Sequence, residues 1–214
     1  MEKQRKFCPL YIFAGLYIIG VYTVVPVLYL LNRDVISNDT HGTLTAGSVL
    51  LPLLIPVILG LVNLFAVIIL RRSVRREQLL NAALAVKYAL VPFYLTGGLC
   101  IAAAILLIFT PVVIMVFLGP AVALTLGTAG WLILLGSAPF SVGYLARAKK
   151  DGVHAPALCI TAGVLQFFFT ADVVSMMILA IREKKWIRVT VALLILLLTA
   201  VIGAVIWLIL KINS

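Results

Sequence analysis

Charged residues are scarce in this chain. Only 11% of its 214 residues are Asp, Glu, Lys or Arg, and 64% are hydrophobic, whereas an ordinary soluble domain has about 25% charged and about 45–50% apolar residues. This composition excludes a soluble globular protein. It also excludes a disordered chain, because disorder requires low hydrophobicity. The class that remains is an integral membrane protein.

Cysteine and histidine are also rare. The three cysteines (Cys8, Cys100 and Cys159) contain no CxxC pattern and provide neither a disulfide framework nor a zinc site. Two histidines, His41 and His154, are too few for a multi-histidine metal site. The motifs HExxH and GxSxG, the P-loop and the dinucleotide-binding glycine pattern are missing. We therefore expect no enzymatic activity and no cofactor.

Long apolar runs dominate what is present. A helix needs roughly 20 apolar residues to cross a hydrocarbon core of about 30 Å. The first run is too long for the h-region of a signal peptide and lacks a small-residue cleavage site, so we expect it to be retained. The sequence thus predicts an all-α, polytopic protein with a single transmembrane domain over 1–214 and no soluble domain. The six predicted spans are about 9–31, 47–70, 82–109, 121–145, 156–181 and 187–210.

Basic residues between the runs predict the topology. Lys and Arg are retained on the cytoplasmic side, which places the N-terminal tail and the segments 71–77 and 147–151 there. Six spans satisfy this with both termini in the cytoplasm and the protein in the cell membrane. Four cations of the segment 182–188 then fall outside. A re-entrant 156–181 would bring them inside, leaving five spans and an external C-terminus.

A weak internal repeat favours the complete crossing. At an offset of about 74 residues, Arg75-Arg76-Glu77 aligns with Lys149-Lys150-Asp151, and Phe93-Tyr94 aligns with Phe167-Phe168. Such repeats are common in transporters. The register predicts three parallel helical hairpins, in which 156–181 crosses the membrane as 82–109 does.

Asp172 is the leading candidate for a functional residue. A lone ionised carboxylate in a span costs about 2.5–3.5 kcal/mol, so it must be neutralised, paired or hydrated. We expect it to face the bundle interior within reach of Asn63 or Ser137, which coincide at the repeat offset. On a continuous helix Gln166 and Thr170 share one face, and Asp172 lies on nearly the opposite one. These five residues form the predicted substrate-binding or ion-binding set.

Lys87 is the other charge inside a predicted span. It lies near the inner end of 82–109, where a lysine normally reaches the interface. Depths counted from the inner helix ends separate it from Asp172 by more than about 15 Å, so no ion pair between them is expected.

Helix-interrupting residues, which often flank binding sites, are frequent in the spans. They include Pro52, Pro56, Pro92 and Pro139.

Two function classes fit these features. The first is a small transporter or channel-like permease with an intramembrane acidic site at Asp172. The alternative is a non-catalytic membrane accessory, assembly or immunity protein, in which Asp172 is an interfacial anchor and the partner is a second copy or another membrane protein. The net charge of +10 reflects contact with anionic lipid headgroups and does not indicate nucleic-acid binding, because the cations form short juxtamembrane clusters.

Overall fold

The computed structural model describes residues 8–36, 46–70, 73–109 and 112–212, and within these ranges it contains helices and no strand. The all-α prediction is confirmed. The long helices are α1 (Leu10–Ile36), α2 (Ala46–Leu70), α3 (Arg76–Leu106), α4 (Val113–Lys150) and α7 (Ile187–Ile212). Two short helices, α5 (Pro156–Leu165) and α6 (Ala171–Arg182), lie between α4 and α7, and a 3-10 turn, η1 (Leu107–Phe109), extends α3.

Four helices of the described chain are long and apolar enough to cross a membrane, namely α1, α2, α3 and α4. Their outer surfaces carry large exposed apolar side chains such as Ile69, Phe117 and Leu124. A soluble monomer rarely exposes so much contiguous apolar surface. The helices are therefore compatible with a membrane protein. The basic tail and Arg71-Arg72, used above to predict topology, lie outside the described residues.

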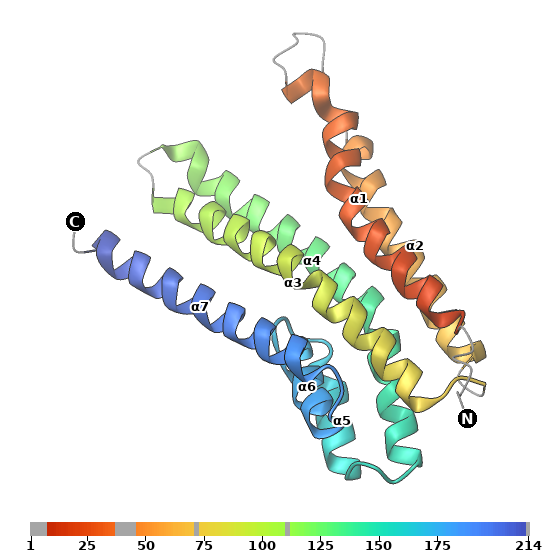
Figure 1. Ribbon diagram of the computed structural model, residues 1–214. Coiled ribbons are helices and arrows are strands. Elements are labelled where there is room, and N and C mark those ends of the chain that lie inside the picture. The colour runs from red at the N-terminus through yellow and green to blue at the C-terminus, as the bar shows by residue number, and fades with distance from the viewer. Residues whose placement is uncertain (1–7, 37–45, 71–72, 110–111, 213–214) are drawn as a thin grey trace.

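The long helices form two antiparallel pairs, α1 with α2 and α3 with α4, which contact each other at one end and diverge toward the other (Figure 1). Glycine permits the contact between the pairs. A Cβ atom added to Gly60 of α2 would lie 2.6 Å from the Cα atom of Gly136 in α4. Small residues let membrane helices approach this closely, so the crossing of α2 and α4 depends on these two glycines.

The expectation that prolines interrupt the spans is wrong. Helices α2, α3 and α4 continue through Pro52, Pro56, Pro92 and Pro139. Around Pro139, side chains supply extra hydrogen bonds to the carbonyls of α4. Tyr17 donates to the carbonyl of Ile133, and Ser137 donates to that of Leu134 at 2.8 Å. Neither bond replaces the one that Pro139 removes, whose acceptor would be the carbonyl of Leu135, but both hold the turn of α4 that precedes it.

The break occurs instead in the predicted span 156–181, which is not a continuous helix. Helix α5 ends at Leu165, and the chain turns through residues 166–170, where Thr170 has a φ of 66°. Helix α6 then runs back along α5, since Gln166 lies 2.9 Å from Ser175 and His154, before α5, lies 3.3 Å from Glu183, after α6. Both ends of this hairpin lie at the same end of the bundle. The prediction of one continuous helix over 156–181 is wrong. A hairpin with both ends at one end of the bundle has the backbone course that the re-entrant alternative requires.

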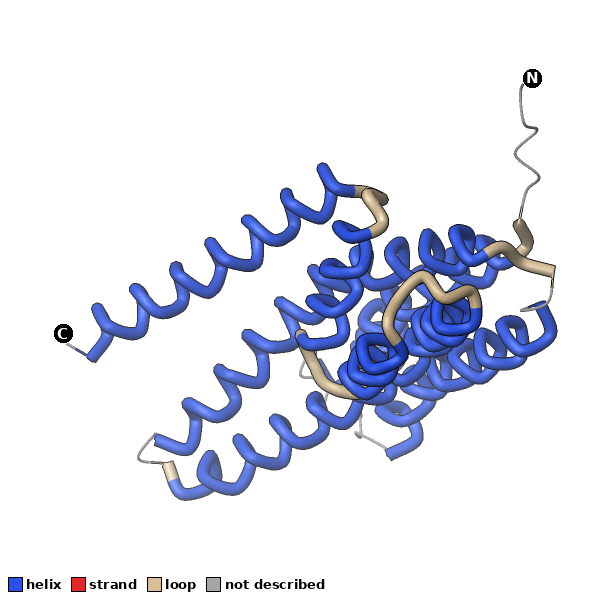
Figure 2. The backbone as a smooth tube through the Cα atoms, turned by 90° about the horizontal axis from the view of Figure 1, so that it is seen from below, coloured by secondary structure: helices blue, strands red, loops and turns tan. Residues whose placement is uncertain are grey.

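Neither the six spans nor the 74-residue repeat is confirmed. The repeat register would place α3, an unbroken helix of 31 residues, on the bent α5–α6 hairpin. Helix α7 follows the hairpin. It contacts α3 near its start, where the hydroxyls of Tyr88 and Thr190 lie 2.6 Å apart. Its C-terminal half stands away from the other helices (Figures 1 and 2).

Candidate functional site: a buried ion pair

A lysine–aspartate ion pair lies in the interior, where α3, α4 and α6 meet. The ammonium of Lys87, in α3, donates to Oδ2 of Asp172, in the first turn of α6. It also donates to the hydroxyl of Ser137, in α4, at 2.9 Å. The exposed fractions of the Lys87 and Asp172 side chains are 0% and 1%. The pair is therefore removed from both solvent and lipid.

This pair contradicts the expectations that Lys87 reaches the interface and that it cannot meet Asp172. Errors in the predicted depths of Lys87 and Asp172 along the bundle explain why the ion pair was not expected. Helix α3 begins at Arg76, six residues before the predicted start, so Lys87 lies about 16 Å from that helix end. Because α6 runs back, Asp172 is about 15 Å from the end at Arg182. The two depths coincide.

Polar side chains in the hairpin hold Asp172 in place. Gln166 donates to the hydroxyl of Ser175 at 2.9 Å, and that hydroxyl donates to the backbone carbonyl of Asp172 at 2.9 Å. The prediction that Gln166 and Asp172 lie on nearly opposite faces is wrong, because the turn at 166–170 folds one helix onto the other and brings the Gln166 amide within 3.5 Å of the Asp172 carbonyl. Gln166 and Ser175 are both buried and tie the end of α5 to the start of α6.

The remaining predicted residues do not contact the carboxylate. Asn63 is buried, but its amide donates to the carbonyl of Gly136 at 3.2 Å. Thr170 is exposed at the turn and makes no side-chain cap of α6. Tyr94, which was not predicted, packs edge-on against Phe169 of the hairpin turn, and its buried hydroxyl has no hydrogen-bond partner among the described residues. The site therefore consists of Lys87, Ser137 and Asp172.

A second polar cluster lies at the end of the bundle where α5 begins and α6 ends. It was not predicted from the sequence. Its centre is the carboxylate of Glu183, which accepts from the hydroxyl of Tyr144 at 2.6 Å. His154 lies 3.3 Å and Arg76 3.6 Å from the same carboxylate. The available signal was an acidic residue within the otherwise basic segment 182–188. This cluster fixes the loop between α6 and α7 against α3 and α4.

In the part of the chain that the structure describes, no group of three or more His, Cys, Asp or Glu side chains could hold a metal ion. The chemistry available at the buried site is therefore that of a carboxylate, an ammonium and a hydroxyl. These groups can exchange a proton or bind a cation.

Residues 7–186 match the model of a family of unknown function, DUF6652. The chain belongs to this family. The matched stretch contains Lys87, Ser137 and Asp172, and it includes the hairpin α5–α6. No curated protein and no solved structure matches the chain.

Proposed function

We propose that this protein is a small membrane transporter in which Asp172 binds a proton or a small cation. The observation that carries the proposal is the burial of the Lys87–Asp172 pair among three helices. A buried ion pair can often be replaced by apolar residues without loss of stability. Ionisable residues inside membranes more commonly mark ion or substrate pathways. A structural role alone would thus be met more simply by apolar side chains.

In this proposal the ammonium of Lys87 occupies the cation site at Asp172 when no cargo is bound. A proton or cargo cation that reaches Asp172 takes the place of the ammonium at the carboxylate. The ammonium keeps its hydrogen bond to Ser137 at 2.9 Å. The re-entrant hairpin supports the proposal, because irregular backbone at membrane depth is tolerated where it is enclosed by protein or lines a pathway.

The transporter would have five crossings, formed by α1 to α4 and α7, with α5–α6 entering from the basic end. Among the Lys and Arg residues that the structure describes, all but Arg33, Lys87 and Lys211 lie in the segments 75–76, 147–150 and 182–188 at that end. The positive-inside rule then places this end in the cytoplasm of a cell membrane. The N-terminus would be cytoplasmic and the C-terminus external, unlike the six-span prediction.

Proteoliposomes test the function. The purified protein is reconstituted, and uptake is measured separately for protons, with an entrapped pH-sensitive dye, for ²²Na⁺ and for radiolabelled methylammonium. We expect at least one of these probes to cross faster than in empty liposomes. Asp172→Asn, assayed at a temperature at which it remains folded, should lower that rate at least tenfold. The matched control is Asp151→Asn, which removes a half-exposed carboxylate at the end of α4. Absence of uptake of all three probes, or equal uptake by Asp172→Asn, would overturn the proposal.

A second candidate is a non-catalytic accessory protein, in which the Lys87–Asp172 pair has a purely structural role. Its support is that neither of two cavities in the described chain, one between α2 and α4 and one between α5 and α6, is lined by Lys87 or Asp172. In that case the pair joins α6 to α3 and α4, and a partner protein or a second copy covers the divergent helices. The double variant Lys87→Met/Asp172→Leu discriminates between the two. With apolar side chains at these two positions, an accessory protein should still fold and bind its partner, whereas a transporter should lose its activity.

A further inference from the structure

A groove on the outer surface of α2 and α4 has the features of a binding site for one lipid. Its volume is about 830 Å³, within the range of about 300–1,000 Å³ typical of small-molecule sites. The wall from α2 includes Gly60 and Leu64, and the wall from α4 includes Val142. The groove is separate from the Lys87–Asp172 pair, since neither residue lines it.

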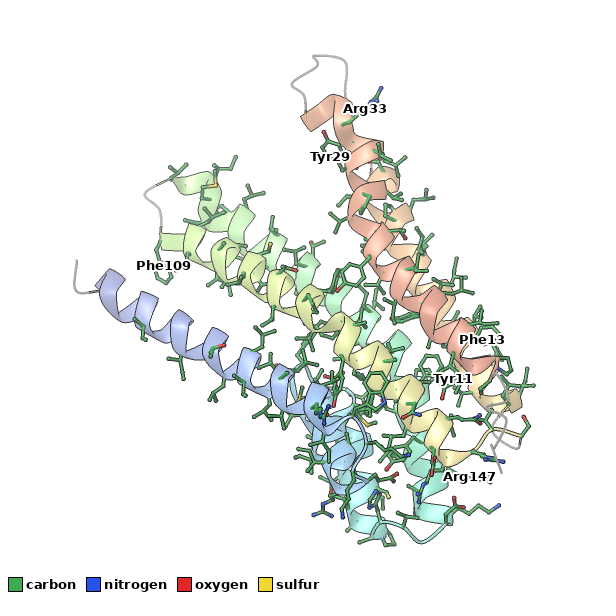
Figure 3. The ribbon with its side chains drawn as sticks, viewed as in Figure 1. Tyr11, Phe13, Tyr29, Arg33, Phe109 and Arg147 are labelled. Atoms are coloured by element: carbon green, nitrogen blue, oxygen red, sulfur yellow. The ribbon has the colours of Figure 1, made fainter. Side chains whose placement is uncertain are left out.

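The two ends of the groove differ in chemistry. One end is closed by Phe167 from the hairpin turn and is apolar. The other carries Arg147 and Lys150, in the last turn of α4. Figure 3 shows Arg147 at this lower end of the bundle, opposite to Arg33 and Tyr29. An occupant that fits must therefore be apolar along most of its length and anionic at one end.

The length and the charge of the groove favour a phospholipid over a protein helix. From Leu132 to Lys150 the α4 wall is about 27 Å long at 1.5 Å per residue, which is enough to accommodate one leaflet with its headgroups, about 20–22 Å thick. A phospholipid carries its anionic phosphate at one end of apolar chains, which matches an apolar groove with cations at one end.

The cationic end is able to hold a phosphate. Lys150 is exposed, and Arg147 lies 3.6 Å from Asp151 in an ion pair whose two side chains are both more than a third exposed. Such exposed pairs contribute little, so the guanidinium can exchange Asp151 for an anionic headgroup. We propose that the α2–α4 groove binds an anionic phospholipid, with the acyl chain along Val142 and Leu64 and the phosphate at Arg147 and Lys150.

Lipid retention tests this proposal. The purified protein is incubated in micelles with equimolar phosphatidylglycerol and phosphatidylcholine carrying the same acyl chains, and the lipids that stay bound are counted by native mass spectrometry. We expect one tightly retained lipid, predominantly phosphatidylglycerol. In Arg147→Gln/Lys150→Gln the preference should fall by about fivefold for each cation removed. The matched control, Lys149→Gln/Arg182→Gln, removes two exposed cations that do not line the groove and should retain the preference.

Filling the groove provides an independent measurement. Val142 is 42% exposed, so Val142→Trp places an indole in the groove rather than in the core, and it should lower retention of both lipids. Leu124→Trp, at an exposed position of α4 outside the groove, should not. Equal retention of the two lipids by the wild type, or retention unaffected by either groove variant, would refute the proposal. Displacement by inorganic phosphate alone would assign the cations to a free anion and would also refute it.

Discussion

Replacing Asp172 with Asn leaves the ammonium of Lys87 in the interior without its counter-ion. Both side chains of the pair are fully enclosed, and breaking such a pair from one side costs about 3–5 kcal/mol. The amine can limit this cost by losing its proton. From an ordinary lysine pKa of about 10.4, deprotonation at pH 7 requires about 4.6 kcal/mol, which agrees with the upper part of the range. We therefore expect Asp172→Asn to be strongly destabilised.

The free cysteines provide the assay. Cys8 and Cys159 are buried, whereas Cys100 is exposed. In a Cys100→Ser background, a thiol-reactive fluorescent dye therefore reports unfolding as the two buried thiols become accessible. With about 2–4 °C per kcal/mol for a chain of this length, Asp172→Asn should lower Tm by roughly 6–20 °C. Asp151→Asn, which breaks a half-exposed pair, should change Tm by no more than about 4 °C.

The double variant completes the cycle. If the destabilisation arises from an unpaired buried charge, Lys87→Met/Asp172→Leu should recover most of the stability lost in Asp172→Asn, because neither charge then remains. A Tm of Asp172→Asn within about 2 °C of the wild type would refute the reasoning. So would a double variant as unstable as the sum of its two single variants, since that result would mean that the two side chains do not interact.

Three further predictions concern the fold. A cysteine at Lys184 should react with a membrane-impermeant maleimide from the side of the basic loops, and reaction from the opposite side only would restore the six-span arrangement. Gly60→Ala should lower stability by about 1–3 kcal/mol in the thermal assay, because its Cβ meets α4 backbone at 2.6 Å. Gly127→Ala meets nothing within 4 Å and should be neutral, so an equal loss would contradict the close-packed crossing. Glu183→Gln should cost about 1–3 kcal/mol, whereas Glu77→Gln, at a side chain 60% exposed, should cost less than about 1 kcal/mol. Equal Tm values for these last two variants would argue against Glu183 as the centre of its cluster.

Sequence patterns predicted the helices well because apolar run length is a local property. The predicted spans 47–70 and 187–210 agree with α2 and α7 to within two residues. The hairpin was not predicted, because no proline or glycine marks the turn at 166–170. Its direction is decided by distant contacts such as those of Glu183 with Arg76 and His154. Cations in the segment 182–188 had favoured the re-entrant alternative, and the apparent repeat outweighed that signal.

The candidate site was also predictable only in part: the burial of its residues was predictable, and their pairing was not. Burial of Asp172, Asn63, Ser137 and Gln166 was predictable from the energetic cost of polar groups in hydrocarbon, and the structure buries all four. Pairing was not predictable, because it depends on where each helix begins. A six-residue error at the start of α3 and the reversal of α6 together hid the contact between Lys87 and Asp172.

The spacing of the ion pair along the chain has a consequence for biosynthesis. Lys87 precedes Asp172 by 85 residues, and at about 5–20 residues per second the ribosome takes roughly 4–17 s to bridge that interval. During this delay the nascent α3 holds a cation without its counter-ion, and such a charge is costly to bury alone. The packing of Lys87 against α6 cannot precede synthesis of the hairpin. The order of synthesis thus makes the final packing of α3 a late step in the assembly of the bundle.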